Sequence, residues 1–169
     1  MLYKLEFLFR SFTSKIEYLG HLHYWQRLKE LKMYSISRRY ERYRIIYCYK
    51  IMKDLTPNCN LSWSSTQKYG QTFYVKEYSR YEATNRKQSF HFMGPRLFNA
   101  LPVTLRPYHN NMNFETWKLS LDKFLDTIPD NPVTGPNETG LCEHLTMKQT
   151  NSLLYWIPFL GKSRRRGAI

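Results

Sequence analysis

The stretch that most constrains the fold spans residues 34–55, YSISRRYERYRIIYCYKIMKDL, where one period persists longer than anywhere else in the chain. Large side chains recur there at steps of three or four residues, which places them on one face of an α-helix. They are Ile36, Tyr40, Tyr43, Tyr47, Ile51 and Leu55. Ser35 suits the start of the helix, and Pro57 ends it because proline lacks an N–H group. We therefore expect a long helix whose tyrosine face is buried in the core.

Basic side chains crowd the first turns of this predicted helix, beside the tyrosine face. They are Arg38, Arg39, Arg42 and Arg44, and we expect Arg38 and Arg42 to be mostly exposed. Each cation near a helix N-terminus opposes the macrodipole by about a few tenths of a kcal/mol, so a bound anion would relieve a penalty. A solvated helix face is the alternative interpretation. The pattern alone leaves both open.

The composition favours a polyanionic partner. The chain has a net charge of +13, an aromatic content of 17% and 14 tyrosines among 169 residues, and its isoelectric point is near 9.7. Basic chains rich in tyrosine, tryptophan and arginine suit contacts with RNA or DNA through phosphates and base stacking. We expect secondary phosphate contacts from Arg27, Lys29, Lys32 and Lys50. Tyrosine is also common on half-buried helices, so composition does not decide the function.

The rest of the pattern predicts a mainly α protein: a small helical domain with a minor β-hairpin and a loosely structured C-terminal tail. Further helices are expected at 2–19, from 22 or 24 to 32, at 96–101 with Pro95 in the first turn, and at 114–125 with Asn113 as its cap. The second helix should bury Trp25, Leu28 and Leu31 and expose Arg27.

Shorter segments complete the expected organisation. Residues 58–69 are expected to form a loop, and 72–77 are expected to pair with 89–92 as the hairpin. Residues 1–130 would form the domain. Residues 131–169 would form a linker, rich in proline, glycine and asparagine, and a basic tail.

No catalytic constellation and no cofactor or metal site is predicted. Asp122, Asp126 and Asp130 fall at a spacing of four, but no histidine accompanies them and Pro129 interrupts their helix, so a solvated helix face is favoured. The three cysteines form no CxxC pair, which indicates a reducing compartment. The chain lacks the apolar core of a signal peptide, and its apolar segment at 153–160 is too short to span a bilayer. We expect an intracellular protein, cytoplasmic or nuclear, without a membrane segment.

Four blocks of sequence carry a resemblance to a known family. They are YWQRLKELKMYSISRRYERYRIIYCYKIMKDLTPNC (24–59), SFHFMGPRLFNALPVTLR (89–106), FETWKLSLDKFLDTIPDNPVTG (114–135) and NSLLYWIPFL (151–160). In this order they resemble the C-terminal region of a reverse transcriptase from a non-LTR (LINE-like) retrotransposon, and GPRLFNALP at 94–102 is the most specific of these motifs. The blocks cover most of the chain, although the segment at 62–88 fits poorly.

The resemblance implies a region downstream of the polymerase palm that helps to hold template RNA, primer or target DNA. The paired aspartates of the palm and the endonuclease would lie upstream, so this chain is expected to be no enzyme by itself, although the full-length parent would be an RNA-directed DNA polymerase. We expect a nucleic-acid-binding accessory region. Two alternatives remain: a structural scaffold that packs on the missing polymerase core, or a decayed copy without function.

Overall fold

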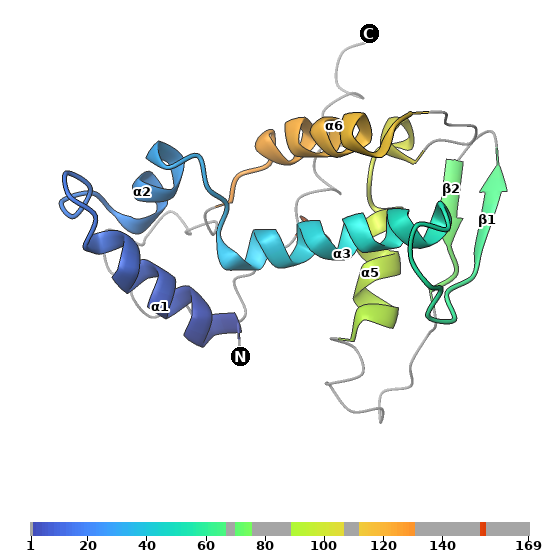
Figure 1. Ribbon diagram of the computed structural model, residues 1–169, viewed down its shortest axis with the longest axis horizontal. Coiled ribbons are helices and arrows are strands. Elements are labelled where there is room, and N and C mark those ends of the chain that lie inside the picture. The colour runs from blue at the N-terminus through green and yellow to red at the C-terminus, as the bar shows by residue number, and fades with distance from the viewer. Residues whose placement is uncertain (1, 67–69, 76–88, 107–111, 131–152, 155–169) are drawn as a thin grey trace, which may run out of the picture.

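The computed structural model describes residues 2–66, 70–75, 89–106, 112–130 and 153–154 (Figure 1). Its elements in chain order are α1 (Leu2–Ser14), α2 (Tyr24–Glu30), α3 (Ile36–Met52), β1 (Trp63–Thr66), β2 (Gly70–Phe73), α5 (Phe90–Asn99), the 3₁₀-helix η1 (Val103–Leu105) and α6 (Phe114–Asp126). The predicted class, mainly helical with a small antiparallel hairpin, is confirmed. No helix in these described ranges is both long and apolar enough to cross a bilayer.

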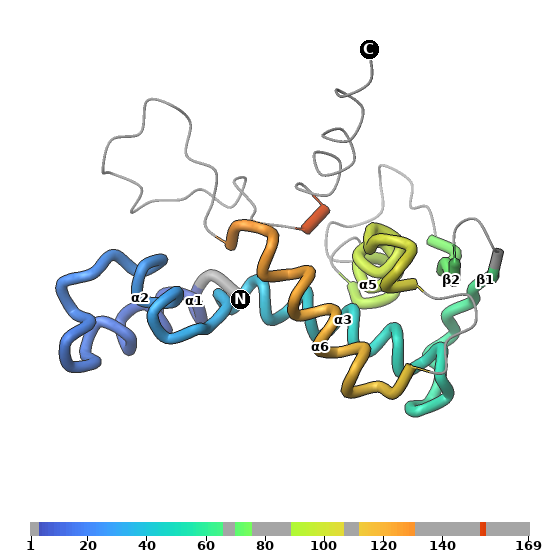
Figure 2. The backbone as a smooth tube through the Cα atoms, turned by 90° about the horizontal axis from the view of Figure 1, so that it is seen from above, coloured from blue at the N-terminus to red at the C-terminus, as the bar shows by residue number. Residues whose placement is uncertain are grey.

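The long helix α3 is the axis of the molecule. The helix α6 lies along it in both views, α5 packs on another side, the hairpin lies beyond the C-terminal end of α3, and α1 and α2 lie at the N-terminal end (Figure 1, Figure 2). Trp117 near the start of α6 stacks on Tyr49 near the end of α3, whereas Asp122 further along α6 binds Arg42. The two helices are therefore antiparallel.

The caps of the two long helices are as the sequence predicts. The Ser35 hydroxyl accepts a hydrogen bond from the backbone N–H of Arg38 (3.1 Å), and the Asn113 side chain accepts one from the N–H of Glu115 (3.1 Å). These bonds satisfy N–H groups that the first helical turn leaves without partners. Helices α1 and α3 end earlier than predicted, at Ser14 and at Met52 respectively.

The prediction of which face of α3 is buried is wrong. Tyr40, Tyr43, Tyr47 and Leu55 are exposed, Ile36 is half-buried, and Ile51 alone of the six lies in the core. The buried side chains of α3 are instead Arg38, Glu41, Ile45, Ile46, Cys48, Tyr49, Ile51 and Met52. The steps from Ile45 to Cys48, Tyr49 and Met52 are also helical, so the sequence holds two apolar stripes. Periodicity cannot say which of two such stripes the neighbouring helices cover.

The helix α5 begins earlier than predicted. It runs from Phe90, so Pro95 lies inside it rather than in its first turn, and residues 89–92 begin a helix instead of pairing as a strand. Gly94 allows α5 to approach α3 closely, because a Cβ atom there would meet the Cys48 sulfur at 3.0 Å and the Phe90 ring at 2.8 Å. Gly94 therefore serves close packing between the two helices rather than a local turn.

The hairpin forms from segments other than those expected. The strands β1 and β2 pair antiparallel with Trp63 opposite Phe73, so the predicted loop at 58–69 contains a strand. Asn99 makes the hydrogen bonds that a third strand would make with β2. Its side-chain amide accepts a hydrogen bond from the Phe73 N–H and donates one to the Phe73 carbonyl, both at 2.8 Å. Gly70, with φ +66°, must be glycine because a Cβ atom would lie 1.8 Å from the carbonyl oxygen of Arg106.

A short piece beyond the predicted domain boundary at residue 130 belongs to the core. Leu153 is fully buried, and its N–H donates to the buried carboxylate of Glu41 on α3 (3.0 Å). Residues 131–152 and 155–169 lie outside the described ranges, so the predicted linker and basic tail remain predictions.

Replacing Tyr49 by alanine should destabilise the fold far more than replacing Tyr47, because Tyr49 is 2% exposed and stacked on Trp117 at 3.8 Å between ring centroids. We expect Tyr49→Ala to cost about 3–5 kcal/mol, the usual range for deleting a buried aromatic ring, and Tyr47→Ala about 1 kcal/mol or less. Urea unfolding of the two variants checks this. Equal costs would contradict the assignment of the buried face.

Candidate nucleic-acid interface

Asp122 and Asp130 pair with arginines of α3, contrary to the prediction of a solvated face, whereas Asp126 is exposed as that prediction expects. Asp122 receives two hydrogen bonds from the guanidinium of Arg42, from Nε at 2.5 Å and from Nη2 at 2.8 Å. Asp126 accepts a hydrogen bond from the Tyr34 hydroxyl. The Asp122 bonds are the main cause of a raised pKa for Arg42, which stays charged. A paired arginine of this kind offers less to an external phosphate than a solvated one.

Arg38 is buried, although the sequence predicts an exposed phosphate ligand. It is 1% exposed; its Nη2 donates to the carbonyl of Pro129 (2.8 Å), and its Nε lies 3.5 Å from Asp130 Oδ1. Asp130 also accepts hydrogen bonds from the Ser35 N–H (2.6 Å) and hydroxyl (2.8 Å). Burial raises the pKa of Asp130, while these bonds and the charge of Arg38 act in the opposite direction. Arg38 therefore fastens the segment after α6 to the start of α3.

Arg27 is also buried, against expectation, and joins α1 to α2. Its guanidinium donates to the carbonyls of Leu22 (2.6 Å) and Arg10 (3.2 Å) and to the Thr13 hydroxyl (3.3 Å). In the same helix Leu28 is buried as predicted, while Trp25 is half-exposed. The guanidinium can be buried here because its donors bond to two backbone carbonyls and a hydroxyl. Such bonding is how proteins tolerate buried charges.

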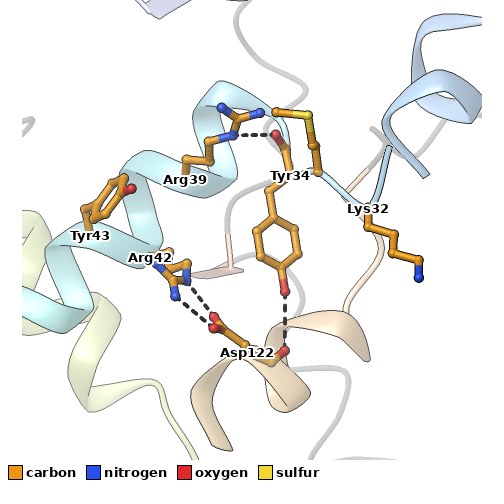
Figure 3. A pocket seen from close by; sticks show the side chains of 7 residues that line it. Lys32, Tyr34, Arg39, Arg42, Tyr43 and Asp122 are labelled. Atoms are coloured by element: carbon orange, nitrogen blue, oxygen red, sulfur yellow. Dashed lines mark hydrogen bonds and ion pairs between the residues drawn. The ribbon is translucent and has the colours of Figure 1, made fainter. Parts of the chain in front are cut away.

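Three of the predicted phosphate ligands line one hollow of about 290 Å³ between the α2–α3 connection, α3 and α6 (Figure 3). We call it the basic pocket. Its lining residues are Lys32, Met33, Tyr34, Arg39, Arg42, Tyr43 and Asp122. Three cations against one carboxylate give the pocket an excess of positive charge.

Arg39 lines the basic pocket and has one buried donor without a described partner. Its Nε donates to the Tyr34 carbonyl (2.8 Å) and its guanidinium lies over the Phe9 ring at 4.6 Å. Its Nη2 is buried and finds no hydrogen-bond partner among the described residues. A buried donor without a partner is rare in native proteins and costs about 1–3 kcal/mol, more when it is charged. Because this atom is buried from solvent, it marks a cost at Arg39 rather than a contact that the open pocket offers.

Lys32 reaches the pocket from a strained backbone position. It has φ +51° and closes α2 in the manner usually assigned to glycine, with its N–H bonded to the Lys29 carbonyl and that of Met33 bonded to the Leu28 carbonyl. A side chain in this left-handed region costs about 1–2 kcal/mol, and such residues cluster at functional sites. The lysine is exposed.

Tyr34 supports the same pocket. Its hydroxyl donates to the backbone oxygen of Asp122 (3.3 Å) as well as to Asp126. Burial and the bond to Asp126 raise its pKa, so the phenol stays neutral. The sequence predicted neither Tyr34 nor Tyr43 as site residues. The sequence signal that could have located this pocket was the four-residue spacing of the aspartates at 122–130, whose negative charge complements the basic start of α3.

The remaining predicted contacts lie outside the pocket. Lys29 is exposed on α2. The guanidinium of Arg44 lies over the Tyr40 ring at 4.1 Å and donates to its hydroxyl (3.1 Å), and the Lys50 ammonium lies over the Phe114 ring at 5.1 Å. The structure thus gathers three of the eight predicted cations and separates the others.

Comparison of the chain with protein-family models, with curated proteins and with solved structures finds no match. The resemblance to a reverse transcriptase therefore stays a prediction. Among the residues that the structure describes, no group of three or more histidine, cysteine, aspartate or glutamate side chains could hold a metal ion.

Replacing Asp130 by asparagine should destabilise the protein, because it leaves the buried guanidinium of Arg38 without its carboxylate. Removing one partner of a buried pair costs about 3–5 kcal/mol, and we expect about 2–3 kcal/mol here because the Asp130 side chain is 20% exposed. Asp126→Asn removes the same charge from an exposed residue and should cost about 0.5 kcal/mol or less. Denaturant unfolding compares the two, and similar losses would show that the Arg38 contact is unimportant.

Proposed function

We propose that this chain is a nucleic-acid-binding accessory region of a retroelement reverse transcriptase, without catalysis of its own. The observation that carries the binding proposal is the basic pocket, whose lining includes Lys32, Arg39 and Arg42 beside the single carboxylate of Asp122. The net charge of +13 supports the same class of ligand, because it attracts a polyanion before any contact forms. The family origin rests on the sequence blocks alone.

A backbone phosphate suits the pocket in both charge and rigidity. Arg42 is held in place by two bonds to Asp122, and Arg39 by its bond to the Tyr34 carbonyl and by the Phe9 ring. Their donors are therefore positioned before a ligand arrives, which lowers the entropy lost on binding. Lys32, which is exposed and flexible, would complete the site as a point charge. Such contacts fix position and carry no sequence preference.

A second candidate function is a scaffold that packs on a polymerase core. The observation in its favour is on α1, where Leu5, Leu8 and Phe12 follow one helical stripe and are all exposed, with Leu8 at 62%. A stripe of this kind on a helix is usually covered by a partner. The core that the resemblance implies would cover it. Both functions could belong to one protein, since α1 and the basic pocket are different surfaces.

The two functions differ in their response to salt. For single strands the slope of log affinity against log salt concentration is about −0.7 for each neutralised phosphate. If the pocket binds phosphate, Lys32→Ala should reduce the magnitude of the slope by about 0.7, and Lys32→Ala combined with Arg39→Gln by about 1.4. Fluorescence anisotropy with a labelled oligonucleotide over a salt series measures both values.

The matched control is Lys4→Ala combined with Lys15→Ala, two exposed lysines in or next to α1 that remove the same charge elsewhere. We expect this control to leave the slope within about 0.3 of the parent, because diffuse charge contributes less than a direct contact. Equal slopes for the pocket and control double variants would overturn the pocket as the binding site and favour the scaffold. Thermal unfolding of each variant confirms that it is folded.

A further inference from the structure

The packing of the described residues leaves the tyrosine face of α3 exposed. Tyr40, Tyr43 and Tyr47 lie on one side of the helix, at steps of three and four residues, and are 43%, 61% and 39% exposed. At a rise of about 1.5 Å per residue, their positions are about 4.5 and 6 Å apart along the axis. We call these three side chains the tyrosine ridge. Their spacing is close to that of successive bases in a partly extended single strand.

Arginine side chains accompany the rings of the ridge. The Arg44 guanidinium lies 4.1 Å from the Tyr40 centroid, and the Arg42 guanidinium lies 5.8 Å from the Tyr43 centroid. At the far end, Phe90 meets Tyr47 edge to face with 5.1 Å between centroids. Bases stack on aromatic rings and on guanidinium planes alike, and positive charge attracts the phosphates between them. A solely apolar partner would instead have to desolvate these cations.

We propose that the tyrosine ridge is a stacking platform for single-stranded RNA or DNA, whose bases lie on the rings while a neighbouring phosphate enters the basic pocket. This proposal rests on the proposed function and restricts the nucleic-acid ligand to unpaired strands. Tyr43 connects the two parts, because it lines the pocket and is also the most exposed ring of the ridge. Bases in a duplex are already stacked on one another, so a duplex would reach the pocket but not the ridge.

The test compares two single-stranded oligonucleotides of equal length and phosphate number, one with bases and one built only from abasic sites. Each base–ring stack contributes about 5- to 160-fold in affinity, so the parent protein should bind the base-containing strand at least about tenfold more tightly. Tyr43→Leu should reduce that preference by about fivefold or more. Tyr43→Phe keeps the ring and should retain it. Tyr43 is exposed, so neither change should prevent folding.

Each alternative outcome has a different meaning. Equal binding of both strands, still weakened by Lys32→Ala, would overturn the ridge and leave the pocket intact. A base preference that Tyr43→Leu does not change would place the stacking elsewhere and also overturn the proposal, as would preferential binding of a duplex. No binding of either strand at low salt would overturn the proposed function itself. Concentration-dependent self-association, abolished by Tyr43→Leu without any base preference, would identify the ridge as a contact between copies of the chain.

Discussion

The antiparallel contact between α3 and α6 is the interaction on which the rest of this structure depends. At one end it is apolar, with Trp117 stacked on Tyr49 and its indole N–H bonded to the Leu105 carbonyl (3.0 Å). At the other end it is ionic and polar, with Asp122 on Arg42 and Asp130 on Arg38. The change follows the sequence of α3, whose first turns are arginine-rich and whose last turns are apolar. The acidic spacing after Leu121 complements the basic half.

The energetic roles of these two ends differ. The apolar end buries large rings, and burial of apolar surface is the largest favourable contribution to folding. The buried ion pair adds little net stability, because desolvation of both charges offsets their attraction. It does oppose a displacement of the segment after α6, since Asp130 would then leave its place beside the buried Arg38. The apolar end therefore stabilises the contact, while the charged end holds the segment after α6 in place.

This arrangement also determines which cations remain for a ligand. Arg27 and Arg38 serve the fold, and Arg42 is shared between Asp122 and the wall of the basic pocket. Arg39 and Lys32 complete that wall from positions that carry a cost: a buried donor without a described partner and a left-handed lysine. Costs concentrated around one hollow are typical of binding sites. The high formal charge of the chain thus overstates the number of cations that a nucleic acid could contact.

Sequence alone determined the existence of the helices and their caps. Ser35 and Asn113 act locally, through side-chain oxygens that reach the first turn, and α6 has a single apolar stripe with Trp117, Leu121 and Leu125 on its buried face. The periodicity indicated the fold class, and the composition indicated the positive charge. These features depend on residues close together in the chain, so local chemistry suffices to predict them.

The tertiary structure alone decided which face of α3 is buried. The Tyr40–Tyr43–Tyr47 stripe and the Ile45–Cys48–Tyr49–Met52 stripe both have helical spacing, and only the positions of α5 and α6 distinguish them. The same holds for Arg38, which looks like a surface residue until Asp130, far along the chain, provides its counter-charge. Asn99 likewise supports the hairpin from a distance along the chain, since its amide bonds to Phe73 at the edge of β2. The buried face of α3 and the pairing of Arg38 depend on partners distant in sequence, which the pattern within that one segment cannot specify.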